Sequence, residues 1–441
     1  MKKHSVLAWS MVVALGGFLF GFDTAVISGA EKSIQQFWQL SVMQHGLTIS
    51  IALIGTVIGS LLGARPSDIF GRKNTLYFVA AAYLLSSIGT AFAYNWYLFL
   101  MFRLLGGLGV GISSVTAPIY ISEVSPADRR GRLVGLFQFN VVLGILVSYL
   151  SNYLISQGGE ESWRWMLGVQ AFPSLVFIIL IFFIPESPRW LILKKGEVAK
   201  ALEILRIINP LDCDKELAAI QNSKLKEGAS TTNLFSGQYK TPIVLAVFFA
   251  FFNQVSGINA IIYYAPRIFE MAGLGAHSSL LSTVGIGLVN FIFTLLGINV
   301  IDKVGRRILM LVGSLGLVVS LFLVAFTFYS GHFNGFAIPA YMMIFIAFFA
   351  FSQGAVIWVF ISEIFPNQVR AKGQTLGSST HWIMAAIIAF CFPYLAETLG
   401  GAVTFSFFCV MMVCQFIFVW KFMPETKGRS LEQIETSFIM H

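Results

Sequence analysis

GARPSDIFGRK (residues 63–73) recurs as GINVIDKVGRR (residues 297–307), at an offset of 234 residues. Both stretches follow an apolar run and keep a glycine, an aspartate, a second glycine and two basic residues at fixed spacing. A repeat of this kind indicates that the chain contains two copies of one structural unit.

Two further motifs repeat in the same order. ISEVSP (121–126) recurs as ISEIFP (361–366) at an offset of 240, and PES (185–187) recurs as PET (424–426) at an offset of 239. Three motifs at nearly one offset predict two parallel structural repeats, with a solute site between them.

The composition indicates that lipid surrounds much of the chain. Its 441 residues are 56% hydrophobic and only 11% charged, whereas soluble domains carry about 25% charged residues. Apolar runs of about 20 residues predict membrane-spanning helices rather than a barrel. We therefore expect an all-α membrane protein with twelve spans, near residues 8–30, 46–64, 76–93, 97–121, 133–155, 165–184, 243–271, 280–301, 308–329, 340–361, 373–395 and 403–422.

The placement of basic residues predicts the orientation. With both termini in the cytoplasm, 25 of the 29 Lys and Arg residues lie inside, three (Lys32, Arg164, Arg267) lie outside, and Arg103 lies within a span. Cytoplasmic loops of membrane proteins carry this excess. The net charge of +8 thus reflects topology, and no nucleic-acid partner is expected.

The least hydrophobic stretch divides the spans six and six. We predict an N-terminal six-helix bundle at 1–185, a cytoplasmic linker with short amphipathic helices at 186–240, a C-terminal six-helix bundle at 241–423 and a cytoplasmic tail at 424–441. The four cysteines show no paired spacing, so neither a disulfide framework nor a metal site is expected. No cofactor is expected either.

These motifs carry a family resemblance. Together with RLLGGLG (103–109), PESPRWL (185–191), QVSGIN (254–259) and PETKGR (424–429), they resemble the sugar porter family of the major facilitator superfamily over essentially the whole chain. The resemblance implies the major facilitator fold, alternating access, and a sugar or cyclic polyol as substrate. It also implies a multi-pass protein of a bacterial inner membrane that works as a monomer.

Polar and aromatic side chains in the middle of spans are candidates for the solute site. Small-molecule sites are mostly apolar, with a few placed polar groups, and a buried amide is costly without a partner. The candidates are Gln138, Asn253, Gln254, Asn259, Asn290, Trp358, His381 and Trp382. The resemblance implies that Gln138, Gln254, Asn259, Asn290 and Trp358 contact sugar; hydrogen bonding between helices alone is the alternative.

Four residues depart from the family pattern or admit a second interpretation. Asn253 replaces a glutamine, and His381 stands where the family tends to have Gln or Asn. Tyr263 and Tyr264 resemble an extracellular gate, although tyrosines at the membrane interface need no such role.

Two charges inside spans suggest proton coupling. Asp23 is the only acid well within an apolar run, and Arg103 is the one base within a span. A lone carboxylate there costs about 2.5–3.5 kcal/mol on the insertion scale, so we expect the two side chains to pair. The resemblance implies proton symport, because relatives that couple sugar to protons have Asp at this position. A static ion pair is the alternative.

The cytoplasmic motifs predict ion pairs between the two halves when the cytoplasmic side is closed. The carboxylates would also cap helix ends, while the arginines reach acidic partners. The residues concerned are Asp68, Arg72, Glu123, Arg130, Asp302, Arg306, Glu363 and Arg370. Enforcing topology by positive charge is the alternative.

The sequence therefore predicts proton-coupled symport of a monosaccharide, either a hexose or a pentose. A facilitative uniporter in which Asp23 is structural is the first alternative. A nutrient sensor is disfavoured, because sensors of this fold carry a long signalling extension. A membrane enzyme is rejected, because no His-Glu-x-x-His, nucleophile elbow or phosphate loop is present.

Overall fold

The computed structural model describes residues 2–126, 129–159, 161–226, 234–235, 237–333, 335–366 and 369–427. Within these ranges every regular element is a helix. The first half contains α1 (Lys2–Phe37), α2 (Val42–Leu62), α3 (Ala64–Phe70), α4 (Arg72–Ala91), α5 (Trp96–Glu123), α6 (Arg130–Ile155), α7 (Ser162–Gly168) and α8 (Ala171–Phe182).

Short helices follow, as expected: α9 (Pro188–Trp190), the π-helix η1 (Leu191–Lys195), α10 (Val198–Ile208) and α11 (Cys213–Lys226). The second half contains η3 (Gly237–Tyr239), α12 (Lys240–Val255), α13 (Ile258–Met271), α14 (Ala276–Val304), α15 (Arg306–Ser330), α16 (Ala337–Phe351), α17 (Gln353–Ile364), α18 (Arg370–Thr398) and α19 (Gly400–Phe422).

All twelve predicted spans are helical. In the described part of the chain, eleven helical segments are long and apolar enough to cross a membrane. The one predicted span that is not among these eleven is α4, whose buried residues include Thr75, Ser86, Ser87 and Thr90. The hydroxyls of Thr75, Ser87 and Thr90 donate to carbonyls three or four residues earlier in the chain, as when Thr90 donates to the Ser86 carbonyl at 2.7 Å. A helix can therefore bury them although they lower its apolarity.

Three spans are broken within the bundle. One divides into α7 and α8, one into α12 and α13, and one into α16 and α17. A glutamine lies at or beside each break: Gln170 precedes α8, Gln254 is near the end of α12, and Gln353 begins α17. In membrane transporters, discontinuous helices of this kind accompany binding sites because their free backbone groups need polar partners.

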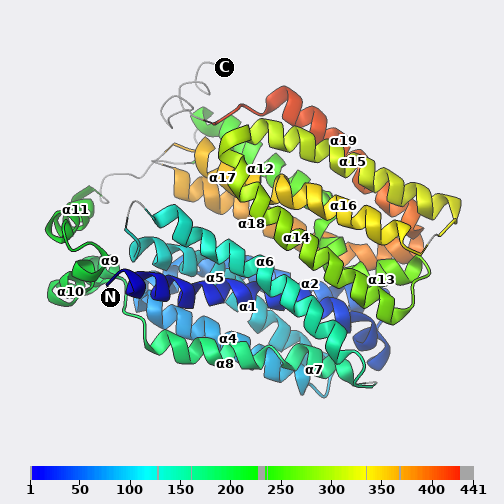
Figure 1. Cartoon of the computed structure of the whole chain (residues 1–441), viewed down its shortest axis with the longest axis horizontal. Helices are drawn as coiled ribbons and strands as arrows, with labels where there is room; N and C mark the ends of the chain where they lie inside the picture. The colour runs from blue at the N-terminus through cyan, green and yellow to red at the C-terminus, as the bar shows by residue number, and fades with distance from the viewer. Residues whose placement is uncertain are drawn as a thin grey trace. The chain divides into compact units, whose positions relative to one another are not determined.

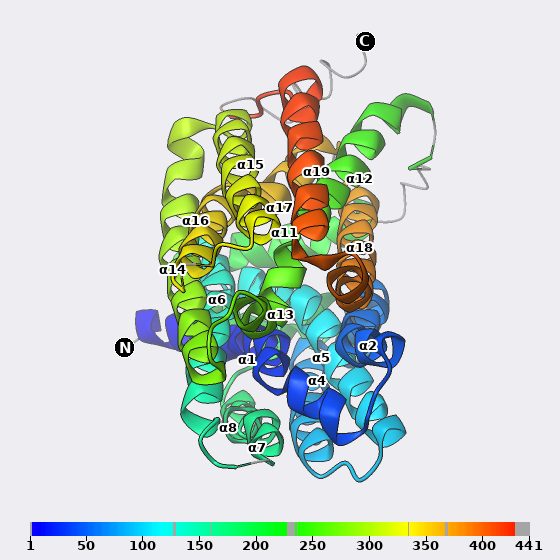
Figure 2. The same cartoon turned by 90° about the vertical axis from the view of Figure 1, so that its right-hand side faces the viewer.

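Contacts divide the chain into two units. Unit 1 comprises Met1–Val26, Ile54–Ser148 and Trp163–Thr231, and unit 2 comprises Ile27–Leu53, Tyr149–Ser162 and Thr232–His441. Within unit 1, α4 packs against α5 and α8, and within unit 2, α15 packs against α16 and α19 (Figures 1 and 2). The domain limits at 185, 240 and 423 stay a prediction.

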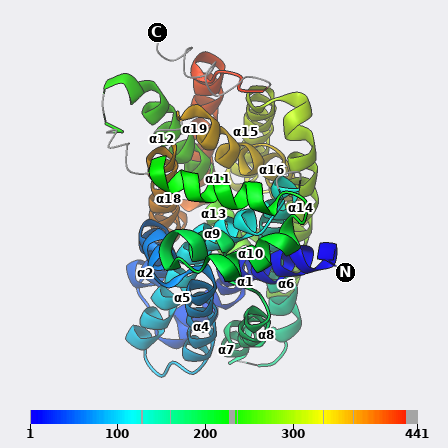
Figure 3. The same ribbon diagram turned by 90° about the vertical axis from the view of Figure 1, so that its left-hand side faces the viewer.

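The short helices between the halves form a small core of their own. α10 buries Ala201, Leu205 and Ile208, which share one face at helical spacing. Trp190 of α9 and Cys213 of α11 belong to the same buried cluster as Ala201 and Leu205. Figure 3 shows α9 and α10 beside each other. The segment is therefore folded where it is described.

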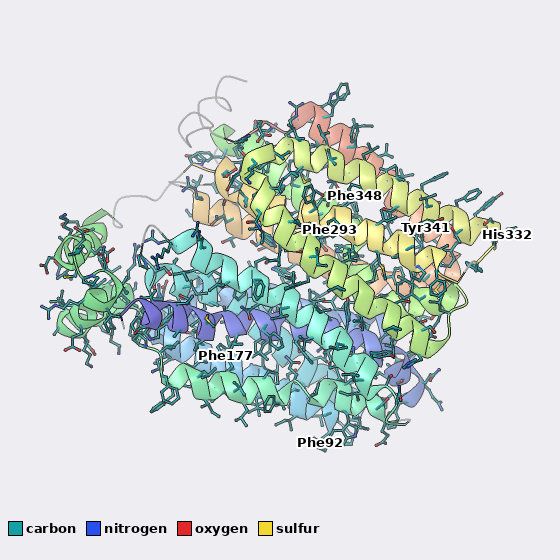
Figure 4. The ribbon with its side chains drawn as sticks, viewed as in Figure 1. Phe92, Phe177, Phe293, His332, Tyr341 and Phe348 are labelled. Atoms are coloured by element: carbon teal, nitrogen blue, oxygen red, sulfur yellow. The ribbon has the colours of Figure 1, made fainter. Side chains whose placement is uncertain are left out.

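Large apolar side chains cover the outside of the helices. Phe92, which Figure 4 shows pointing away from the bundle, is 73% exposed, and Phe182 is 71% exposed. By contrast, Phe177 on the inner face of α8 is fully buried. Soluble monomers rarely expose so much apolar surface, so the surface fits a lipid environment.

Candidate functional site

The break between α12 and α13 places the central amides. Gly257 separates the two helices and has φ = +87°, a conformation that glycine adopts without steric cost. A Cβ at this position would lie 2.6 Å from the ring of Phe408. The hydroxyl of Ser256 donates to the Asn253 carbonyl at 2.7 Å, so this end of α12 is capped.

Gln254 joins four candidate residues into one buried cluster. Its Nε2 donates to Asn253 Oδ1 at 2.8 Å and lies 3.1 Å from a ring nitrogen of His381. Its Oε1 accepts a hydrogen bond from Asn259 Nδ2. All four side chains are buried, and Asn253 Nδ2 has no hydrogen-bond partner among the described residues. The cluster presents both donors and acceptors, as the recognition of hydroxyl groups requires.

Two indole rings flank His381. The ring centroid of Trp358 lies 4.7 Å from that of His381, and the centroid of Trp382 lies 4.9 Å from it. Trp358 is 38% exposed, so part of its ring is available to a ligand. Amides beside a partly exposed aromatic face form the combination that binds a sugar, because the face packs on C–H groups while the amides bind hydroxyls.

Six of the eight predicted solute-site residues are thus brought together within unit 2. Asn290 lies on α14, where its Oδ1 accepts from Thr294 Oγ1 at 3.4 Å. Gln138 lies on α6 in unit 1 and is half-buried. The roles of all eight residues in binding stay a prediction.

Asp23 and Arg103 form the expected pair inside unit 1. Arg103 Nη1 lies 3.2 Å from Asp23 Oδ1, and both side chains are buried. Arg103 Nε and Nη2 have no hydrogen-bond partner among the described residues. A pair held by one of several possible hydrogen bonds leaves much of the guanidinium unsatisfied, which favours a pair that can rearrange.

Gln170 is a neighbour of this pair that sequence reasoning missed. It lies at the break between α7 and α8, is buried, and is close enough to the Asp23 carboxylate to act on it, although its Nε2 has no hydrogen-bond partner among the described residues. The available signal was an amide inside an apolar run, WMLGVQAFP (165–173). The same signal singled out Gln254.

The two predicted gate tyrosines lie on α13 and are buried. Tyr264 donates to the Ala389 carbonyl at 2.9 Å, and its backbone leaves the helical region, with φ = −125° and ψ = 15°. Pro266 has no N–H for the carbonyl of Ile262 four residues earlier, and Tyr149 donates to that carbonyl at 2.8 Å instead. α13 therefore has a kink whose free acceptor is satisfied; the gate role stays a prediction.

Asp23 is not the only deeply buried acid, contrary to the sequence-based expectation. Glu31, two turns further along α1, is 1% exposed. Arg267, which the charge count places on the outer side, lies within α13. Arg267 Nε and Nη2 contact both carboxylate oxygens of Glu31. Window-averaged hydropathy placed Glu31 at the end of a span, whereas packing of neighbouring helices buries it.

The repeated cytoplasmic motifs adopt the same geometry in both halves. Gly71 and Gly305 have φ of +95° and +101° and precede α4 and α15. Glu186 accepts from the backbone N–H groups of Arg72 and Lys73, as Glu425 does from those of Arg306 and Arg307. Each glutamate thereby caps the N-terminus of a helix.

The side chains of the two motif arginines repeat this correspondence. Arg72 binds both oxygens of Glu123, at 2.9 and 3.0 Å, and Arg306 binds both oxygens of Glu363, at 3.2 and 2.8 Å. Each arginine also lies near the aspartate four residues earlier, Asp68 at 3.0 Å and Asp302 at 2.9 Å.

These carboxylate partners come from the same half as the arginine, because each loop packs on the neighbouring helix ends of its own bundle. Arg130 and Arg370 begin α6 and α18, and Arg370 Nε donates to the Phe365 carbonyl at 3.2 Å. The predicted pairing between the halves, in a state closed to the cytoplasm, stays a prediction.

The two capping glutamates differ in their electrostatics. Burial raises the pKa of Glu186 above its ordinary value, against the opposing effect of the N–H groups of Ser187, Lys73 and Arg72. Burial acts in the same direction on Glu425, but the N–H groups of Lys427, Arg306 and Arg307 outweigh it and lower its pKa. The two repeats therefore share geometry but respond to acid in opposite directions.

Comparison with known proteins decides the family. The profile of the family described as "Sugar (and other) transporter" matches residues 9–438. This chain belongs to that family, the sugar porters of the major facilitator superfamily. Members of the family are transporters and not enzymes, and the twelve-helix major facilitator fold predicted for this transporter is confirmed.

Several curated relatives span nearly the whole transporter. The arabinose-proton symporter of Bacillus subtilis is 37% identical over 99% of this chain and 97% of its own length. The D-xylose-proton symporter of Escherichia coli K12 is 34% identical, over 98% and 95%. The inward-open structure of the E. coli xylose transporter XylE matches with a TM-score of 0.87 and 33% identity, over 98% of this chain and 99% of that one.

Proposed function

We propose that this transporter is a proton-coupled symporter that carries a monosaccharide, a hexose or a pentose, by alternating access. The observation that carries the proposal is the buried cluster of Asn253, Gln254, Asn259 and His381 beside the partly exposed ring of Trp358. Amides that bind hydroxyl groups and a ring that covers a C–H face favour a sugar over an ion or an acid. The relatives named above as symporters of arabinose and xylose support the same substrate class.

The buried Asp23–Arg103 pair supports the proton as the coupling ion. Protonation neutralises Asp23 and weakens its attraction to Arg103. If the sugar-loaded protein changes state mainly with Asp23 protonated, the proton gradient drives sugar accumulation. Release follows on the side where the pH is higher.

The proposed setting is a bacterial inner membrane with both termini in the cytoplasm. The excess of Lys and Arg in the loops on that side supports this orientation. We also propose that the monomer is the working unit, since the solute site predicted for the fold is formed within one chain.

The test is uptake of a panel of labelled monosaccharides into proteoliposomes, with and without an imposed proton gradient that is acidic outside. We expect one hexose or pentose to accumulate above its external concentration only when the gradient is present. Equilibration that ignores the gradient would show a facilitative uniporter in which Asp23 is structural. Transport of no sugar or cyclic polyol would overturn the assignment of the amide cluster.

A further inference from the structure

A second buried ion pair, between Glu31 and Arg267, lies in unit 2. Arg267 Nε donates to Glu31 Oε1 at 2.9 Å and Arg267 Nη2 donates to Glu31 Oε2 at 2.7 Å. Glu31 is 1% exposed, and the Arg267 side chain is 13% exposed. Two parallel hydrogen bonds between a guanidinium and a carboxylate make a strong and directional contact.

Four further groups surround the pair. His45 Nε2 of α2 lies 2.7 Å from Glu31 Oε2, and the His45 side chain is fully buried. Gln35 of α1 accepts from Arg267 Nη2 at 2.5 Å, and Glu397 of α18 lies 3.3 Å from Arg267 Nη1. The ring of Tyr264 lies 6.0 Å from that of His45. Helices α1, α2, α13 and α18 therefore converge on one charge cluster, in which Glu31 and His45 are buried and Glu397 is 44% exposed.

The two helices joined by the pair also carry the two predicted functional sites. Glu31 follows Asp23 by eight residues on α1, and Arg267 follows Asn259 by eight residues on α13. Eight residues of helix span about 12 Å, so each helix links the Glu31–Arg267 pair to one of the two sites. The kink at Tyr264 lies between Asn259 and Arg267.

We propose that the Glu31–Arg267 pair is a latch that couples the sugar cluster to the proton-responsive acid. The latch is formed while the outer ends of α1 and α13 are closed, and it breaks when they separate. A rearrangement of α13 at Asn259 is then transmitted through Arg267 to α1, and so to Asp23. Glu31 and Arg267 are positioning residues here, and the inference rests on the alternating access and orientation proposed above.

A second ion pair between α1 and α13 serves as a control for the latch. Lys32 and Glu270 pair between the same two helices, but their side chains are 50% and 22% exposed. Exposed pairs contribute little because water screens them, whereas removing one partner of a buried pair leaves an uncompensated charge. The latch proposal therefore predicts different effects at neighbouring residues.

The first measurement needs neither sugar nor a proton gradient. Hydrogen exchange of the full chain in lipid nanodiscs should show faster exchange around Tyr264–Arg267 in Glu31→Gln than in wild type. Lys32→Gln and Glu270→Gln should leave that segment unchanged. Equal exchange in Glu31→Gln and wild type overturns the latch, and this outcome is independent of whether the transporter couples protons.

The second measurement tests coupling in proteoliposomes. Glu31→Gln should lower sugar accumulation under the proton gradient by about fivefold or more, which is the lower limit of the effects that typical coupling free energies produce. Sugar exchange should continue. Arg267→Lys keeps the positive charge but cannot form the two parallel hydrogen bonds of a guanidinium. Sugar accumulation by this variant should lie between that of Glu31→Gln and that of the wild type. Equal loss of exchange and accumulation would mean a merely structural role and would overturn the proposal, as would equal effects of Glu31→Gln and Lys32→Gln.

Discussion

Gln254 occupies the centre of the amide cluster, because its side chain contacts Asn253, Asn259 and His381 at once. Gln254→Ala removes a donor and an acceptor and leaves the hydroxyl groups of a bound sugar unpaired. We expect sugar affinity to fall by about tenfold or more, or about 1.4 kcal/mol. Equilibrium binding of labelled sugar to purified protein measures this change.

The control for that variant is Asn299→Ala, which removes an exposed amide on α14. Its affinity should match that of the wild type. Unchanged affinity in a folded Gln254→Ala protein would remove Gln254 from the site.

Asp23 is the second decisive residue. Asp23→Asn imitates the protonated side chain permanently and so removes the response of the Asp23–Arg103 pair to a proton. We expect concentrative, pH-dependent uptake to be abolished, while sugar binding and counterflow exchange stay measurable. Uptake and counterflow in the same proteoliposomes separate these effects.

Asp212→Asn, in the segment between the halves, removes an exposed acid that pairs with Lys215 and should leave coupling intact. Continued accumulation by Asp23→Asn that a protonophore still collapses would place the coupling acid elsewhere. Glu31 would then be the next candidate, because it is the other deeply buried acid described above.

At the scale of the element, the break between α12 and α13 positions the amide cluster, with Asn253 and Gln254 before the break and Asn259 after it. Gly257→Ala introduces a left-handed alanine, which costs about 1–2 kcal/mol, and also a clash with the ring of Phe408, 2.6 Å away. We expect a lower melting temperature and a loss of sugar binding. Differential scanning fluorimetry and binding measure the two effects.

Gly400→Ala is matched to it, because Gly400 has φ = +76° but no atom within 4 Å of an added Cβ. The two variants share the backbone strain, so their difference isolates the clash and the displaced amides. Equal effects would show that the geometry at Gly257 has no special importance for the site.

At the scale of the whole molecule, the two repeats share one cytoplasmic network but titrate differently. The lowered pKa of Glu425 means that its stabilising contribution is present above its ordinary pKa of about 4.3 and is lost as the pH falls below it. The raised pKa of Glu186 has the opposite sign, so that its contribution improves as the pH falls toward that value.

We therefore expect the melting temperature of Glu425→Gln to fall less steeply than that of the wild type as the pH drops below about 4.3. Glu186→Gln should leave that acid-side loss in place and change the slope only above it. Melting temperatures of the detergent-solubilised protein across this pH range test both statements. Identical pH profiles for the two variants would contradict the asymmetry.

Features that depend on local composition could be predicted from the sequence. Twelve spans, the two repeats and the amides of the seventh span all follow from apolar run length, from motif spacing, or from polar residues in apolar surroundings. Asp23 and Arg103 were paired from sequence because each was alone within a span. Such inferences succeed because the bilayer core contains no water, so the polar groups of every spanning segment must find their hydrogen-bond partners within the protein.

Which polar groups contact one another became clear from the packing of the helices. Gln170 approaches Asp23, Glu31 meets Arg267 and His45, and Arg72 binds Glu123 of its own half. The hydropathy of a segment averages over about 19 residues and records no neighbour from another helix. A charge near the end of a span therefore has the same local signal whether water surrounds it or packed helices bury it, and the packing alone makes Glu31 part of an ion pair.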